Sequence, residues 1–405
     1  MSNPDSQQSR ALARLASKRL FLLDGTPIGS YPRDMLPLAT ATNGSGVAHN
    51  PYSLRDGVHM HKGLINSANY SKRGVAAFKD DFVVMEWATH EFEDNLRAGA
   101  KREIPLIADI PKFRNWADMI VQRRLRDEPD MAPYSGCKRP LRETNSLKWD
   151  SEHFDLYISE AVQFSQWFLE QKKRRQEEGK GSNLNVVLAK IQAVFSAANT
   201  PHIQGNRKTG PYTSLTSKQR YVIDRVEELI QTTDEKIIVF AKSPEVLKRL
   251  HSELGNIGIE SVLFTGQQDI DKRTAVMNRE FRYGQKRVLL SSYVGQRGLN
   301  LPQASRILKY NRAWTGDTEE QAIARTTRPD QARQVHVEYC QLEGSIDVYM
   351  GMIVDWKIAA ARSGLDYGEN SNATEEFRHL DAILEAFCLE TLAMSTHEYQ
   401  ALLAA

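Results

Sequence analysis

The sequence has few cysteines and no long hydrophobic run. The three cysteines, Cys137, Cys340 and Cys388, stand far apart in the 405 residues and lack the spacing of metal ligands. This usage predicts reduced, buried thiols rather than a disulfide framework. No apolar segment is long enough to cross a bilayer, and the N-terminal MSNPDSQQSR lacks the apolar core of a signal peptide. We therefore expect a cytoplasmic protein with no membrane partner.

The sequence also lacks a marked excess of positive or negative charge. The formal net charge is +2, with 53 Lys and Arg against 51 Asp and Glu. Bulk charge therefore gives no indication of nucleic-acid binding, and any basic surface has to be local. With 41% hydrophobic and 26% charged residues, the chain has the composition of a globular protein of two or three domains.

The sequence further lacks the two segments with which many nucleotide-hydrolysing enzymes hold ATP. The phosphate-loop pattern G-x-x-x-x-G-K-[ST] does not occur in the 405 residues. The nearest text, EEGKGSN, lacks the first glycine and has Gly181 where Ser or Thr should follow the lysine. No acidic box follows a buried strand, because DEPDM and DEKI have the composition of surface segments. Nothing in the sequence is thus expected to cradle phosphates or to hold Mg²⁺.

What is present, from Lys218 onward, is a regular alternation of strands and helices. Short apolar runs typical of buried strands are followed by amphipathic segments; the runs are KIIVFA, IESVLFTG, KRVLLSSY, ASRILKYN and VHVEYCQLEG. This alternation predicts a parallel, doubly wound α/β domain. Residues 78–181 and the tail 345–405 are expected to be mainly helical. Leu20 to Leu23, ended by Asp24-Gly25, predicts a further buried strand, and a helix is expected near Pro32.

The stretch TEEQAIARTTRPDQ places Arg325 and Arg328 three residues apart. On a helix this spacing points both guanidiniums to one side, and two such forks suit a polyphosphate. Two expected strand ends also carry small residues that let a ligand approach the backbone. These are DGTPI, with Gly25 and Thr26, and LLSSYVGQRGLNL, with Ser291, Ser292, Gly295, Gly298 and Asn300.

The order and spacing of these blocks resemble one family. The chain resembles the C-terminal part of the Swi/Snf-type ATPases, which are superfamily II helicase-like DNA translocases. The blocks similar to its motifs III, IV, V and VI are SRALARLASKRLFLLDGTPIGSYPRDMLPL, EKIIVFAKSPEVLKRLHSEL, LLSSYVGQRGLNLPQASRIL and NRAWTGDTEEQAIARTTRPDQ. The chain departs from the family at 295–297 and 311–316, and these changes leave the arginine pair intact.

The resemblance implies a fold and a division into domains. It implies an α/β, RecA-like, parallel-sheet helicase C-terminal lobe with a helical insertion and a fragment of the N-terminal lobe. The expected ranges are 1–75 for the remnant of the N-terminal RecA-like lobe with motif III, 76–205 for the helical protrusion and linker, 206–345 for the helicase C-terminal lobe, and 346–405 for a helical brace and tail.

The resemblance also implies roles for individual residues. Arg325 and Arg328 would be catalytic arginine fingers, and Lys242, Ser291 and Ser292 would contact the backbone of duplex DNA. Residues expected to bind ATP or to couple the lobes are Gly25, Thr26, Gly295, Gly298, Asn300, Gln321 and Gln331. ATP and Mg²⁺ would bind only together with the absent N-terminal lobe, and the location would be nucleoid-associated.

Three hypotheses follow. In the first, the chain resembles a translocase cut just after its acidic box. It is then the C-terminal motor half of an ATP-dependent DNA translocase, inactive alone, whose phosphate loop and acidic box come from a partner polypeptide or a missing lobe. The apolar strand at Leu20 to Leu23 would need such a cover. In the second, the chain is a non-catalytic DNA- or protein-binding remnant of such a motor. In the third, the arginines form surface salt bridges, which these blocks, standing in family order, argue against.

Overall fold

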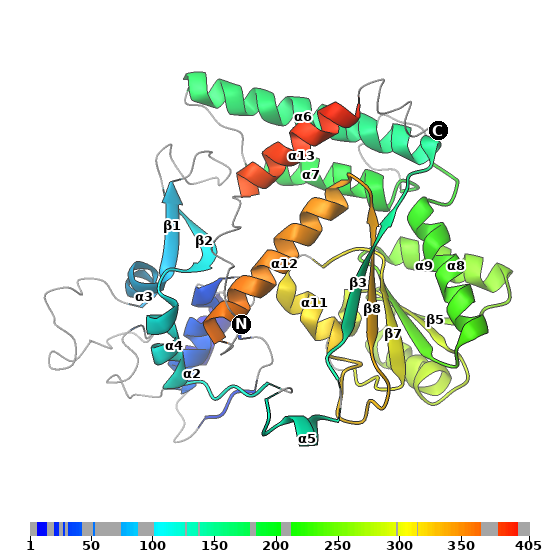
Figure 1. Ribbon diagram of the computed structural model, residues 1–405, viewed down its shortest axis with the longest axis horizontal. Coiled ribbons are helices and arrows are strands. Elements are labelled where there is room, and N and C mark those ends of the chain that lie inside the picture. Colours follow the sequence, from blue (N-terminus) through cyan, green and yellow to red (C-terminus); the bar gives the residue numbers. More distant parts are fainter. Residues whose placement is uncertain are drawn as a thin grey trace, which may run out of the picture.

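A computed structural model of the chain describes most of its residues (Figure 1). The described ranges are 6–13, 20–23, 27–28, 31–42, 52, 74–87, 101–125, 128–136, 138–178, 184–203, 212–296, 299–313, 315–365 and 380–395. Gly25, Thr26 and Gly298 lie outside these ranges. Within them, no helix combines the length and the apolar character needed to span a bilayer.

Six strands of the described part form one parallel sheet, in the order β3-β8-β7-β4-β6-β5. Every neighbouring pair runs parallel, which confirms the fold predicted from the alternating strands and helices. The interior strands β4 and β6 are almost entirely buried, as their apolar runs require. The bounds are β3 Leu141–Leu147, β4 Lys236–Phe240, β5 Ser261–Phe264, β6 Val288–Ser291, β7 Ala304–Lys309 and β8 His336–Leu342.

Helices cover both faces of this sheet. On one face, α8 (Ser217–Thr232) and α9 (Pro244–Asn256) bury Val222, Val226 and Leu250 against the strands. On the other face pack α10 (Ile270–Val276), the π-helical continuation η3 (Met277–Arg282) and α11 (Gly316–Ile323). A short 3-10 turn, η4 (Tyr293–Gln296), follows β6. Each strand thus ends in a loop at one edge of a rigid scaffold, where ligands bind in open parallel sheets.

Strand β3 lies within the range 76–205, for which the resemblance implies a helical protrusion and linker. Leu141 of β3 pairs with His336 of β8, so a strand from within that range completes the sheet of the C-terminal lobe. Two more strands, β1 (Val83–Trp87) and β2 (Lys101–Ile107), form an antiparallel pair there. The helices of the range are α3 (Val75–Phe82), α4 (Ile110–Asp118), α5 (Ala132–Ser135), α6 (Ser151–Glu178) and α7 (Leu184–Asn199). The boundary expected at residue 205 therefore cuts through one sheet.

The N-terminal part holds both a correction and a confirmation. Residues 20–23 form no strand, and Phe21 and Leu23 are 85% and 100% exposed, so the expected burial of this run is wrong. The helix expected near Pro32 is present as η1 (Pro32–Met35) followed by α2 (Leu36–Thr42), and α1 spans Gln7–Ala13. The described part of this region has its own aromatic core, made by Tyr52, Phe78, Phe82, Phe113 and Trp116.

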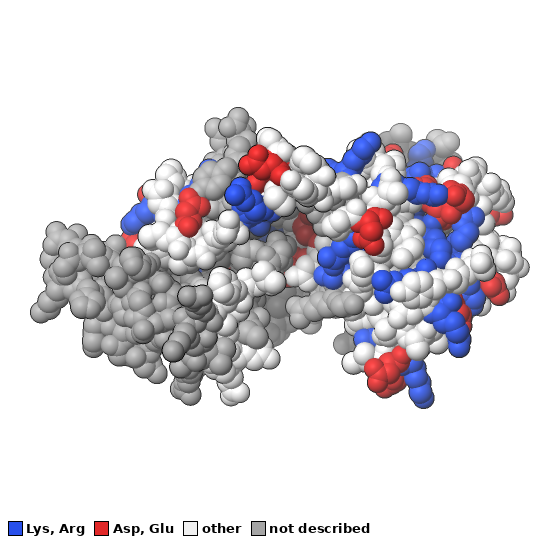
Figure 2. Space-filling view, turned by 90° about the horizontal axis from the view of Figure 1, so that it is seen from below, with Lys and Arg blue, Asp and Glu red and all other residues white. Residues whose placement is uncertain are grey.

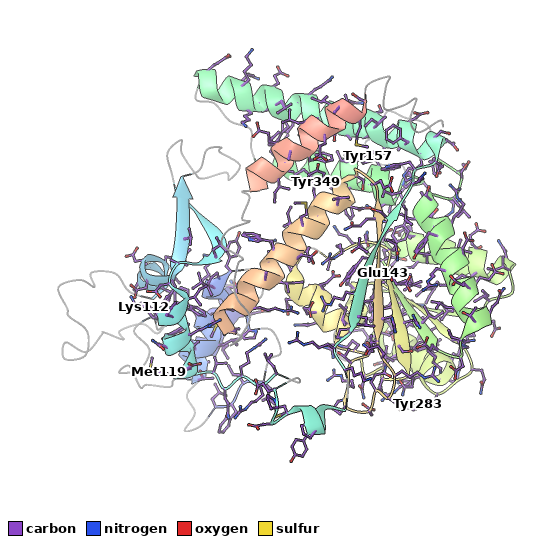
Figure 3. All side chains as sticks on the ribbon, viewed as in Figure 1. Lys112, Met119, Glu143, Tyr157, Tyr283 and Tyr349 are labelled. Carbon is purple, nitrogen blue, oxygen red and sulfur yellow. The ribbon has the colours of Figure 1, made fainter. Side chains whose placement is uncertain are left out.

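The last two described helices pack on the other parts of the fold, and one of them connects the sheet-bearing part with the N-terminal part. α13 (Leu380–Met394) packs on α6 and α7, while α12 (Ile346–Leu365) begins at this group and crosses toward α4 and β2 (Figure 1). The hydroxyl of Tyr157 on α6 accepts the N–H of Ile346 at 3.0 Å, which fixes the start of α12. Figure 3 shows Tyr157 beside Tyr349 at this end of the helix.

Candidate nucleotide and nucleic-acid site

Helix α11 carries the sequence that leads to the arginine pair. The Thr315 hydroxyl caps its N-terminus by accepting the N–H of Thr318, and the helix ends at Ile323. Arg325 and Arg328 therefore lie after the helix, and the expectation that they share a helical face is wrong. Residues 324–331 are called the arginine turn below. The sequence held the signal for this end, because Pro329 disfavours helical geometry at the residue before it.

Arg325 is anchored to the segment that precedes β7. Its Nε donates to the Gln321 carbonyl oxygen at 3.1 Å and its Nη1 to the Leu299 carbonyl oxygen at 3.3 Å. The Leu301 N–H donates back to the Arg325 carbonyl oxygen at 2.9 Å. Burial and the positive charge of Arg328 both lower the pKa of Arg325, so the two guanidiniums share one electrostatic environment.

Arg328 keeps an unused donor in this environment. Its Nε is buried and has no hydrogen-bond partner among the described residues. In the same part of the chain, neither Arg325 nor Arg328 forms an ion pair with a carboxylate. The side-chain oxygen of Asn300, between the two residues that bond to Arg325, is also buried without a partner. An unpaired buried donor is expensive, so the Arg328 Nε suits an anion that supplies an acceptor, whereas the Asn300 oxygen needs a donor.

The two glutamines have their polar groups bonded within the fold. Gln331 is 3% exposed, and its Nε2 donates to the carbonyl oxygens of Ala304, at 2.8 Å, and Thr326, at 3.3 Å. The Gln321 Nε2 donates to Asp317 Oδ1 at 2.6 Å. Gln331 thus ties the arginine turn to the start of β7, and Gln321 supports Arg325 through its carbonyl. A direct contact of either amide with nucleotide stays a prediction.

The loop after β6 is tightly built. The Ser291 hydroxyl donates to the Ser292 carbonyl oxygen at 2.9 Å. A Cβ on Gly295 would lie 2.4 Å from that hydroxyl oxygen, so glycine is required there by close approach. The Ser292 hydroxyl is buried and has no partner in the described structure. The loop therefore presents one free hydroxyl at the carboxyl end of a central strand.

Lys242 joins this loop from the neighbouring strand β4. The N–H of Ala241 donates to the Ser291 carbonyl oxygen at 3.2 Å, so the structure brings Lys242 and the two serines to the same edge. The Lys242 Nζ lies 5.0 Å from the centre of the Phe195 ring, and burial lowers the pKa of Lys242 to about 8. This lysine still carries most of its charge at pH 7, as a phosphate contact needs.

Lys309 is a buried cation that sequence reasoning missed. It ends β7, is fully buried, and its Nζ has no hydrogen-bond partner among the described residues. The Nζ lies 4.3 Å from the centre of the Phe240 ring and 4.9 Å from that of Tyr293. Burial lowers the pKa of Lys309 to about 8. The text LKYN carries no signal for this environment, which depends on rings from β4 and η4.

On the face drawn in Figure 2, the sheet-bearing part of the molecule carries Lys and Arg side chains with acidic side chains between them. The described residues contain no group of three or more His, Cys, Asp or Glu side chains suited to hold a metal ion.

Comparison with known proteins agrees with these features. Residues 221–330, which include both arginines, match the family described as "Helicase conserved C-terminal domain". The chain is 31% identical over 155 residues to a "Probable global transactivator" of Orgyia pseudotsugata multicapsid polyhedrosis virus, covering 37% of this chain and 31% of the relative. It is 23% identical over 395 residues to "Protein CHROMATIN REMODELING 25" of Arabidopsis thaliana, covering 86% and 37%.

Among solved structures, the "Sulfolobus solfataricus SWI2/SNF2 ATPase core in complex with dsDNA" matches with a TM-score of 0.42 and 17% identity, covering 90% of this chain and 70% of that one. The chain spans about a third of the length of the two curated relatives, at 31% and 37%. The resemblance seen in the sequence motifs is confirmed by the family match and the curated relatives.

Proposed function

Because residues 221–330 form a helicase conserved C-terminal domain of the Swi/Snf type, we propose that the chain is the C-terminal motor half of an ATP-dependent DNA translocase. The 405 residues contain no phosphate loop and no acidic box. These segments come from a second polypeptide segment, either a partner chain or a preceding lobe. The observation that carries the proposal is the arginine turn, where two half-buried guanidiniums lack carboxylate partners in the described residues and one Nε is orphaned.

The arginine turn acts on the phosphates of ATP. Arg325 and Arg328 approach the β- and γ-phosphates from across the interlobe cleft and neutralise the charge that spreads over the equatorial oxygens. Arg325 is held by carbonyls of Gln321 and Leu299, so its fork is oriented before nucleotide arrives. Mg²⁺ would be held by the acidic box of the other segment and would supply further neutralisation of phosphate charge.

The loops at the carboxyl ends of β4 and β6 act on DNA. Lys242, Ser291 and Ser292 lie at one edge, and ammonium and hydroxyl donors of this kind suit phosphate oxygens. Such contacts grip the sugar-phosphate backbone, so binding is weakly sequence-specific and depends strongly on salt.

The segment Leu20–Leu23 is where the other polypeptide segment docks. Phe21 and Leu23 are large, apolar and mostly exposed, in a segment that forms neither helix nor strand. Exposed apolar side chains beside an unpaired backbone favour pairing with the edge of another sheet. The added strand joins this chain to the sheet that carries the phosphate loop.

One observation favours a second function, a non-catalytic DNA- or protein-binding remnant of such a motor. Gln321 and Gln331 use their side-chain amides inside the fold rather than presenting them to a ligand. A remnant would keep the DNA loops and show no turnover with any partner.

Steady-state ATP hydrolysis distinguishes the two functions. The chain is assayed alone and mixed with a polypeptide from the same organism that carries a phosphate loop and an acidic box, each with and without duplex DNA. The motor half predicts no hydrolysis alone and DNA-stimulated hydrolysis in the mixture. Hydrolysis by the isolated chain would sink the proposal, and duplex binding without turnover in any mixture would favour the remnant.

A further inference from the structure

Arg312, in the loop after β7, joins two helices. It is 8% exposed and forms a bidentate ion pair with Asp355 of α12, with Nη1 3.2 Å from Oδ2. Its Nε lies 3.2 Å from Oε1 of Glu319 on α11, and Glu319 is fully buried. The guanidinium carbon also lies 4.3 Å from the centre of the Tyr339 ring. One side chain thus links α12 to α11, by a bidentate fork to Asp355 and by a charge contact with Glu319 whose two nearest atoms do not form a hydrogen bond.

Two more contacts hold the same helices together. Glu320 of α11 forms ion pairs with Arg142 of β3 at 2.7 Å and with Arg362 of α12 at 3.6 Å. A Cβ on Gly316 would lie 2.4 Å from Cγ1 of Ile358, so the start of α11 lies directly on α12. Any rotation or shift of α12 therefore moves α11 as well.

The arginine turn continues directly from α11. The Ala324 N–H donates to the Glu320 carbonyl oxygen at 2.8 Å, and Arg325 Nε donates to the Gln321 carbonyl oxygen at 3.1 Å. Glu319 and Glu320, which α12 contacts through Arg312 and Arg362, thus precede Arg325 by six and five residues, and Arg328 follows three residues later.

The far end of α12 lies in the N-terminal part. A Cβ on Gly364 would lie 2.3 Å from Cδ1 of Ile107 on β2 and 3.1 Å from Phe113 on α4, and Leu365 joins the aromatic core there. Figure 3 labels Tyr349 near one end of α12 and Lys112, on α4, beside the other. A helix of 20 residues spans about 30 Å and behaves as a rod.

We propose that Arg312 is a positioning residue, through which α12 sets the placement of the arginine turn. The inference rests on the proposed function. A partner that docks on the N-terminal part shifts the Gly364 end of α12, and the Asp355–Arg312–Glu319 contact passes this shift to α11. Arg325 and Arg328 are then aligned only when the partner is present. Arg312 and Asp355 do not touch nucleotide, and their effect is on alignment.

Hydrogen exchange without nucleotide tests the inference independently of ATP hydrolysis. Asp355→Asn removes one charge at a side chain that is 63% exposed, so the fold is kept, and Asp355→Glu preserves the pair. We expect amides of residues 316–331 to exchange about tenfold faster in Asp355→Asn, with β4 unchanged and Asp355→Glu near wild type. Asp224→Asn, an exposed carboxylate on α8, is the matched control. Unchanged exchange at 316–331 in Asp355→Asn overturns the inference and leaves the proposed function standing.

Perturbation of the far end supplies the second test. Gly364→Val pushes α12 away from Ile107 and Phe113, and we expect the same faster exchange at 316–331. In the reconstituted motor, both Asp355→Asn and Gly364→Val should lower kcat severalfold with the KM for DNA unchanged. Faster exchange confined to residues 101–121 in Gly364→Val would show that α12 does not transmit the shift, and would overturn the inference.

Discussion

Cationic side chains are buried at two places, the junction of α7, α8 and α12 and the arginine turn. The two places differ in the hydrogen-bond partners that these cations have. At the junction, Lys218 is fully buried and its Nζ donates to Asn199 Oδ1 at 2.8 Å and to Asp347 Oδ2 at 2.7 Å. Asn199 in turn donates to Asp347 Oδ1 at 2.9 Å. In the arginine turn, Arg328 Nε has no such partner in the described residues. The satisfied network at the junction suits a structural role, whereas the unpartnered Arg328 Nε is available to a ligand.

We expect the largest effect, a loss of ATP hydrolysis, from substitutions in the arginine turn. Arg328→Ala in the reconstituted motor should lower the ATP hydrolysis rate by about 10³-fold or more, because an arginine finger stabilises charge in the transition state. Arg325→Ala should behave similarly. Arg328→Lys should not rescue, since an ammonium lacks the fork. Steady-state rates and duplex affinity, measured together, check this. Near-wild-type turnover of Arg328→Ala would remove the arginine turn from catalysis.

At the junction of α7, α8 and α12, we expect substitutions to lower the stability of the fold. Asp347→Ala leaves Lys218 and Asn199 buried without their carboxylate, and we expect a loss of about 3 kcal/mol in the free energy of unfolding. Urea denaturation measures the loss, with Asp224→Ala on the exposed face of α8 as control. Equal stabilities of the two variants would contradict the structural role of the network.

Lys309 provides an intermediate case. This buried cation has no hydrogen-bond partner among the described residues, it lies beside two aromatic rings, and the carboxylate of Glu319 is near enough to raise its pKa. Burial lowers the pKa of Lys309 from 10.5 to about 8, so between these values the unfolded chain binds more protons than the folded one. This lysine therefore adds stability as pH rises through that window. Lys309→Met should raise the free energy of unfolding at pH 7 by about 2 kcal/mol. Above pH 8, it should also make this free energy depend less on pH. The exposed Lys248→Met should do neither.

The smallest effect is expected for a single contact to DNA. Lys242→Ala should weaken binding to every duplex by a similar factor and reduce the slope of log affinity against log salt by about 1. Fluorescence anisotropy over a series of salt concentrations measures both quantities. A slope equal to that of the wild type would show that Lys242 does not contact a phosphate.

The sequence was informative where local pattern decides structure. β4 and β6 are mostly apolar runs, and the interior of a parallel sheet requires such runs. The text LRETNSL of β3 is mostly polar, and the strand exists because β8 pairs with it across almost two hundred residues. Leu20–Leu23 has the composition of a strand but no neighbour in the described part. Propensity alone cannot report whether a partner strand is there.

For the candidate site, the sequence allowed the residues to be selected, but it did not predict the side chains that surround them in the fold. Arg325, Arg328 and Asn300 could be selected from spacing and resemblance, because they stand in short motifs. The ion pair of Arg312 with Asp355 and the ring contacts of Lys309 join elements that are distant in sequence. Such contacts are fixed by packing, so no local pattern predicts them.

Strand β3 has a consequence for how the polypeptide folds and how it should be dissected. Its pairing with β8 closes a loop of almost two hundred residues, so this edge of the sheet forms late, after the locally connected strands β4 to β7. A fragment trimmed to the matched range 221–330 would lack both β3 and β8, and one extended through β8 would still lack β3. The exposed backbone edge of β7 in the first fragment, or of β8 in the second, would then be a template for intermolecular pairing. Expression of the lobe in monomeric form therefore requires a start before Leu141, well upstream of the recognisable domain.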